Sequence, residues 1–137
     1  MAVYERAASG LYFLCPEGEY MLKHGISITL PVKFTGIDLD DVSKIEFLFK
    51  TDNKENGRAV KTSVYKSSGT GDAQRRDGTE DIIDIPWSKA ETYRFPSGKE
   101  FYMDTRITLT DSSENPVTQV LSLRMDESLF AEEEAYG

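Results

Sequence analysis

Apolar residues occupy every second position from Ile26 to Phe34, where the chain runs Ile-Ser-Ile-Thr-Leu-Pro-Val-Lys-Phe. Successive side chains of a strand point to opposite faces, so this period predicts a half-buried β-strand and not a helix. Pro31 falls among the solvent-facing positions of this strand. Because proline has no N–H to donate to a neighbouring strand, we expect an edge strand or a bulged one.

The same period recurs over residues 43–50 and predicts a second strand. The residues of its apolar face are Ile45, Phe47 and Phe49. Leu48 is also apolar but falls among the polar residues of the opposite face. Residues 51–57 are rich in Asp, Asn and Gly, which tolerate tight-turn geometry, and are predicted to form a turn.

A third strand is predicted over residues 58–66, with its apolar face formed by Val60, Thr62 and Val64. Residues 67–81 combine Gly, Ser and charged residues without an apolar anchor, which indicates an exposed and mobile loop. Ile82–Ile85 forms a brief strand that ends at Pro86.

A short helical turn is expected after Trp87. Ser88 and Glu91 have the Ser-x-x-Glu spacing of a capping box, in which each side chain accepts a hydrogen bond from the backbone of the other residue. The segment 93–96 ends in proline and limits the helix to one or two turns. Such a short connection is typical of a link between the two sheets of a β-sandwich.

The clearest predicted hairpin lies near the C-terminus. Residues 100–110 and 117–125 both alternate with period two, and a polar turn at 111–116 separates them. In total the pattern predicts about seven short strands, one helical turn and no long amphipathic helix. This pattern predicts an all-β, antiparallel β-sandwich and argues against an α/β fold.

The predicted sandwich occupies residues 26–130 of the 137. Residues 1–25 contain a short apolar run and a turn, and are expected to form an N-terminal arm or hairpin. Residues 131–137 form an acidic tail. The length is that of one domain, large enough for a single hydrophobic core.

Charge narrows the range of partners. The chain has 24 acidic and 16 basic residues, a formal net charge of −8. The one tight basic pair, Arg75-Arg76, has acidic residues on both sides. Because such a chain repels phosphate backbones, we expect no nucleic-acid partner.

The chain contains a single cysteine, Cys15, and therefore no intramolecular disulfide. The first ten residues lack the apolar run of a signal peptide, and no segment is long enough to span a bilayer. We accordingly expect synthesis in a bacterial cytoplasm, no secretion through a signal peptide and no membrane partner.

His24 and Cys15 are the candidates for catalysis. A catalytic histidine needs an orienting carboxylate and a nucleophile, and neither neighbours His24 in the sequence, so an exposed turn histidine is the simpler interpretation. Cys15 ends an apolar run, where a buried structural thiol is commoner than a reactive one. A Cys15–His24 dyad is the alternative, although no third group is evident to support it. The prediction is that the protein has no catalytic residues and is not an enzyme.

Acidic residues gather at 38–41, 52–57 and 77–84. The second segment resembles the start of a calcium-binding loop, but Lys54 occupies a position where such a loop needs an oxygen ligand. Turns select Asp and Asn for backbone reasons, so solvated turns explain all three segments. No metal or cofactor is predicted.

Two aromatic residues near the helical turn, Trp87 and Tyr93, have two interpretations. They could form a platform for a sugar ring, which would make the domain a carbohydrate- or ligand-binding module. The favoured interpretation is that Trp87 seals one end of the sandwich core.

A family resemblance runs from Ile26 to the C-terminal strands. It is carried by the segments DDVSKIEFLFK at 40–50 and IIDIPWSKAETYRF at 82–95, by Gly98, and by a paired hairpin containing Arg106. This order of elements resembles small immunoglobulin-like structural proteins of phages and prophages of Gram-positive bacteria. These proteins are similar to the N-terminal domain of the phage baseplate upper protein family. Residues 1–25 depart from the pattern, and Thr105 stands where the family often has Gln.

The resemblance implies an immunoglobulin-like β-sandwich without catalytic activity. It further implies a structural or assembly role in the tail or baseplate of a virion. The expected partners are other virion proteins or further copies of the same chain.

Overall fold

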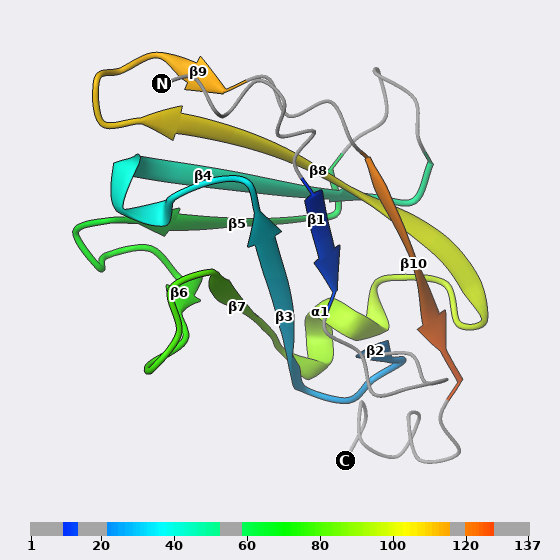
Figure 1. Ribbon diagram of the computed structural model, residues 1–137. Coiled ribbons are helices and arrows are strands. Elements are labelled where there is room, and N and C mark those ends of the chain that lie inside the picture. The colour runs from blue at the N-terminus through cyan, green and yellow to red at the C-terminus, as the bar shows by residue number, and fades with distance from the viewer. Residues whose placement is uncertain (1–9, 14–21, 53–58, 116–119, 128–137) are drawn as a thin grey trace.

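The computed structural model describes residues 10–13, 22–52, 59–115 and 120–127. Its strands form two sheets that enclose a hydrophobic core (Figure 1). The four-stranded sheet has the order β1-β3-β7-β6. Its strands are β1 (Gly10–Phe13), β3 (Ile28–Thr35), β7 (Ile82–Trp87) and β6 (Gln74–Arg75).

The second sheet has the order β2-β10-β8-β4-β5, and its sixth strand, β9, pairs with β8. Its strands are β2 (Leu22–Lys23), β4 (Val42–Lys50), β5 (Lys61–Lys66), β8 (Lys99–Leu109), β9 (Glu114–Asn115) and β10 (Leu121–Asp126). All pairs of neighbouring strands are antiparallel except β2 and β10, which run parallel.

The two strand orders match those of an immunoglobulin sandwich. Strands β1, β3, β7 and β6 occupy the A-B-E-D positions, and β10, β8, β4 and β5 occupy G-F-C-C′. The predicted fold class, an all-β immunoglobulin-like sandwich, is therefore confirmed. No disulfide joins the B and F positions, because the chain has one cysteine.

Short helical segments connect the two sheets. The 3-10 turn η2 (Leu39–Asp41) leads from β3 to β4, and α1 (Lys89–Tyr93) leads from β7 to β8. The predicted capping box at α1 is confirmed: Ser88 Oγ accepts from Glu91 N at 3.1 Å, and Glu91 Oε1 accepts from Ser88 N at 2.9 Å.

Strict alternation in the central strands supplies the core. In β4 the inward residues Ile45, Phe47 and Phe49 have no solvent exposure. Trp87 closes one end of the core, with its ring 4.8 Å from that of Phe49 and 5.3 Å from that of Phe95. Burial of several aromatic side chains in one cluster stabilises this end of the core.

β3 differs from the predicted edge strand. It lies inside its sheet, with β7 along one side and β1 along part of the other, and Pro31 is buried. Phe34 N donates to Asp81 O, so the even-numbered residues of β3 direct their N–H groups toward β7, and Pro31 faces the opposite side. β1 ends there with the Phe13–Val32 pair, one residue short of Pro31. Proline is therefore tolerated because its position adjoins the end of the neighbouring strand.

β5 has the opposite phase to the one predicted. Its buried residues are Lys61, Ser63 and Tyr65. Thr62 is exposed and Val64 is half-buried on the outer face. The reason is the pairing with β4: Ser63 lies directly opposite Phe47, and opposite residues of paired strands point to the same face.

An ion pair accommodates the polar inner face of β5. The side chain of Lys61 is 2% exposed, and its Nζ lies 2.9 Å from Glu91 Oε2 and 5.0 Å from the centre of the Trp87 ring. Partial burial raises the pKa of Glu91, but hydrogen bonds from the Ser88 N–H and the Lys61 ammonium outweigh it, and the net shift is downward. Glu91 thus ties the edge strand β5 to the start of α1.

Most of the segment 67–81 is exposed, as predicted, but it also has a buried anchor, which the sequence pattern did not indicate. Ala73 is completely buried in the core. Arg76 forms a two-point ion pair with Asp84, at 2.8 and 3.1 Å, and the Gln74 amide donates to the backbone of the preceding turn. A small residue and backbone hydrogen bonds hold this segment, and neither produces a hydrophobic pattern.

Three other expectations concern the N-terminal region, the turn of the C-terminal hairpin and the acidic tail. Within residues 1–25, β1 and β2 belong to different sheets and therefore do not form a hairpin with each other. The predicted turn at 111–116 is shorter, because Leu109 N donates to Ser113 O and Glu114–Asn115 already pairs with β8. The tail at 131–137 lies outside the described residues.

Candidate functional site on the six-stranded sheet

The outer face of the six-stranded sheet presents apolar and charged side chains together. Register places Leu48 between Thr62 and Asp104 in one row across β5, β4 and β8. The next row places Glu46 between Val64 and Arg106. Both rows face away from the core because the alternating residues of the same strands fill it.

Exposed hydrophobic surface concentrates on this sheet. Among the described residues, the large hydrophobic side chains that remain exposed are Leu48, at 37%, and Val120, at 48%. Val120 immediately precedes β10, in which Leu121 pairs with the inward-facing Met103 and packs against the core. Alternation therefore places Val120 on the outward side, like Leu48.

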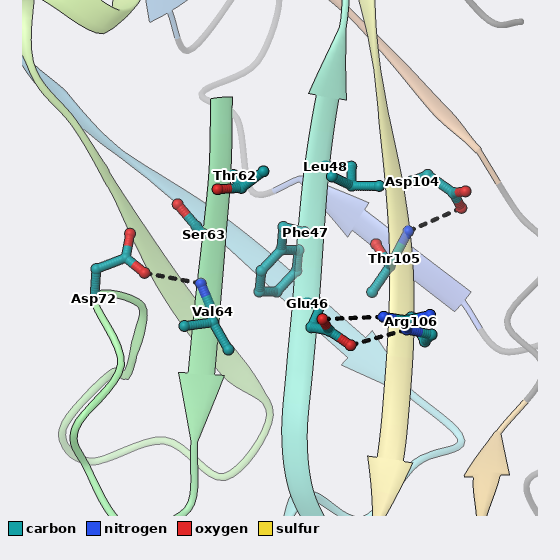
Figure 2. Close-up of a pocket in the computed structure, with 10 residues that line it drawn as sticks. All are labelled: Glu46, Phe47, Leu48, Thr62, Ser63, Val64, Asp72, Asp104, Thr105 and Arg106. Carbon is teal, nitrogen blue, oxygen red and sulfur yellow. Dashed lines mark hydrogen bonds and ion pairs between the residues drawn. The ribbon is translucent and has the colours of Figure 1, made fainter. Parts of the chain in front are cut away.

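A hollow of about 480 Å³ lies over β4, β5 and β8 (Figure 2). Leu48 and Val64 contribute apolar surface to it, and Glu46, Asp104 and Arg106 contribute charge. Figure 2 shows these side chains side by side along three adjacent strands. The hollow is thus a feature of a regular sheet surface and not of a loop cluster.

The Glu46–Arg106 pair is the best-defined polar contact of this face. Arg106 Nε donates to Glu46 Oε1 at 2.8 Å, and Arg106 Nη2 donates to Glu46 Oε2 at 3.1 Å. The hydrogen bond from Arg106 lowers the pKa of Glu46, with a smaller contribution from Lys44. Exposed pairs of this kind contribute little to stability, but they fix the orientation of charge on a surface.

The loop after β5 forms the rim of the hollow. Asp72 Oδ1 accepts from Val64 N at 2.8 Å, and Ala73 N donates to Val64 O at 3.0 Å, so the loop occupies the hydrogen-bonding groups of this edge residue. The approach is close at Gly71, where a Cβ atom would lie 2.2 Å from Val64 O. This contact shields part of an edge strand that would otherwise pair with another chain.

Trp87 and Tyr93 do not form the proposed sugar platform. Trp87 is 2% exposed and belongs to the aromatic core cluster, so its faces are not available for stacking on a ligand. Tyr93 is half-buried, with its ring 4.6 Å from that of His24. The core interpretation of Trp87 holds because the rings of Phe49, Phe95 and Phe101 surround it.

His24 lies on a turn, as predicted, but it is half-buried and not exposed. Its Nδ1 lies 3.0 Å from Phe95 O, and because a carbonyl only accepts, Nδ1 carries the proton. The described side-chain contacts of His24 are thus a backbone carbonyl and an aromatic ring, and neither is the orienting carboxylate expected beside a catalytic histidine. Cys15, the other half of the possible dyad, lies outside the described residues.

The acidic segments are occupied by local contacts. Asp38 Oδ1 accepts from Asp40 N at 2.9 Å, and Asp40 pairs with Arg75 at 3.0 Å. Asp81 and Asp84 pair with Lys33 and Arg76, respectively, while most of 52–57 lies outside the described residues. Across the described part of the chain, no three His, Cys, Asp or Glu side chains are placed to hold a metal ion. Within the same residues, no helix has the length and apolarity needed to cross a membrane.

Comparisons with known proteins add little beyond this geometry. A scan against protein-family models and a search of curated proteins each find no match. Among solved structures, the chain resembles one described as a parallel homodimer of extracellular domains of the voltage-gated sodium channel beta4 subunit, with a role in cell-cell adhesion. The TM-score is 0.39 and the identity 13%, over 86% of this chain and 100% of the other. A likeness at this level carries no argument about function.

Proposed function

We propose that this domain is a non-catalytic assembly module that binds another protein through the outer face of its six-stranded sheet. The observation that carries the proposal is the exposed position of Leu48 at the centre of a row of charged and polar side chains. Protein interfaces characteristically combine an apolar centre with a polar rim. Val64 lies in the adjacent row and adds to the apolar surface of the same hollow.

We further propose that the module serves in the tail or baseplate of a phage or prophage particle. Support for this step is the sequence resemblance over residues 40–50 and 82–95. The alternative, a carbohydrate-binding module, relied on an accessible Trp87, and this residue is buried in the core. The assembly role therefore has the better support of the two.

Co-expression tests both parts of the proposal. The chain is produced together with the proteins encoded beside its gene, and complexes are isolated through a tag on this chain. We expect virion proteins among the neighbours, recovery of the tagged wild-type chain with a partner chain, which is either one of these proteins or an untagged second copy, and loss of the complex with Leu48→Glu. Thr29→Glu is the matched control, because Thr29 is exposed on the other sheet.

Equal recovery with Leu48→Glu and wild type would refute the binding face. The absence of capsid, tail or lysis genes from the neighbourhood would remove the particle assignment, while leaving the binding face open to test.

A further inference from the structure

We infer that the partner of this outer face is a second copy of the chain, bound about a two-fold axis that runs parallel to the strands between β4 and β8. This inference rests on the proposed function and makes it specific. It is argued from the distribution of charge over the face and from the order of residues in its rows.

Positive and negative side chains are nearly balanced on this face. Alternation in β4, β5 and β8 gives it four basic side chains and three acidic ones, a net charge of 4 − 3 = +1. The basic residues are Lys44, Lys50, Lys66 and Arg106, and the acidic residues are Glu46, Glu100 and Asp104. The whole chain carries −8, so the remaining residues carry −8 − 1 = −9. Because positive and negative side chains are nearly balanced here, two copies can approach through this face with little local repulsion despite the negative charge of the whole chain.

The rows of this face are self-complementary. Four pairs lie opposite each other in β4 and β8: Lys44–Thr108, Glu46–Arg106, Leu48–Asp104 and Lys50–Tyr102. A two-fold axis between these strands places each β4 residue against the partner's copy of the β8 residue in the same row. No row then brings like charges together, and Glu46 faces the partner's Arg106 twice in the dimer.

The same arrangement has one imperfect row. Leu48 faces the partner's Asp104, so part of the exposed apolar surface meets a carboxylate. The face also has fewer residues than the roughly 20–30 a side of a standard stable interface. We therefore expect a weak dimer, with a Kd on the order of 10–100 μM.

A charge-swap experiment tests the pairing directly. Glu46→Arg gives each copy two arginine side chains in this row, and Arg106→Glu gives each copy two carboxylates. Each variant alone should self-associate more than ~10-fold more weakly than wild type, because like charges then face each other twice. Mixed in equal amounts, the two variants should form a heterodimer, since every arginine then faces a carboxylate of the other copy.

The measurement is sedimentation velocity on purified full-length chains, with circular dichroism to confirm that each variant is folded. The control is the exposed Arg76–Asp84 pair of the other sheet, where Arg76→Glu and Asp84→Arg should leave association unchanged. Asp104→Leu provides a gain: it puts Leu48 against an apolar side chain and should tighten the dimer several-fold.

A monomeric wild-type chain up to millimolar concentration, or a charge-swap mixture that stays as dissociated as its components, would overturn the inference. Either result leaves the proposed function intact, because the co-expression experiment can still detect a different protein on the same face. If the wild-type chain neither self-associates nor co-purifies with a neighbouring protein, the proposed function is removed as well.

Discussion

The two faces of β4 obey different rules. Its inward residues Ile45, Phe47 and Phe49 are completely buried and contact side chains of both sheets. Its outward residues, including Glu46 and Leu48, lie among charges and solvent. Phe47 and Leu48 are adjacent in the chain and both apolar, so hydrophobicity alone does not separate them. What separates them is the surface to which each belongs: the inner face stabilises the fold, and the outer face is the proposed binding surface.

The largest expected effect is a difference between these two neighbours. Phe47→Ala should lower the free energy of unfolding by about 3–5 kcal/mol, because it leaves a cavity among rigidly packed rings. Leu48→Ala should change it by about 0.5 kcal/mol or less, since the side chain is already in contact with water. Urea denaturation of both variants measures the difference. Equal losses would show that Leu48 belongs to the core and would remove the distinction between the faces.

The next effect is expected where the loop after β5 packs against the edge of the six-stranded sheet. Gly71→Ala forces a Cβ atom against Val64 O and should destabilise the domain by about 2–3 kcal/mol. Gly69→Ala is the comparison, because Gly69 has open space around it but a positive φ of 85°, which costs about 1 kcal/mol for alanine. Thermal unfolding should rank the variants in this order. The reverse order would mean that the loop does not press against β5.

A smaller effect is expected at the polar part of the inner face. Glu91→Gln keeps the hydrogen-bonding shape but removes the negative charge beside the buried Lys61, and should cost about 1–2 kcal/mol at neutral pH after allowance for the partial exposure of Glu91.

The pH dependence of this loss follows from the lowered pKa of Glu91. A carboxyl with a folded-state pKa below its unfolded value stabilises the protein above the unfolded value of about 4.5, and this contribution disappears as pH falls through the folded value. The difference between wild type and Glu91→Gln should therefore shrink below pH 4.5, as followed by urea denaturation over a pH series. A difference that stays constant into acid would contradict the charge interaction.

Much of the fold was predictable from the sequence because period-two alternation is a local property. It identified β3, β4 and β8, and the Ser-x-x-Glu spacing identified the start of α1. The phase of β5 was not predictable, because it is set by which residue of β4 stands opposite Ser63. The anchoring of the 67–81 segment was missed for a related reason: Ala73 is too small to register as a hydrophobic anchor, yet it is buried.

The candidate site was visible in part. Leu48 stood out as an apolar residue on a polar face, and Thr62 and Val64 formed an apolar pattern that the structure turns outward. The sequence does not show that these three side chains lie close together, because their proximity depends on the register between β4 and β5. Sequence reasoning favoured a core position for Trp87 and kept a ligand platform with Tyr93 as the alternative, and the structure agrees with the favoured interpretation.

The most direct test of the binding face is a ¹⁵N-labelled dilution series observed by NMR, from ~1 mM to ~10 μM, a range that spans the expected Kd. We predict concentration-dependent shifts at the backbone amides of Glu46, Leu48 and Arg106, and no change at Thr29 or Asp84 on the opposite sheet. Shifts confined to the β3–β7 surface, or spectra independent of concentration, would contradict the assignment of the outer face of the six-stranded sheet as the surface where two copies meet.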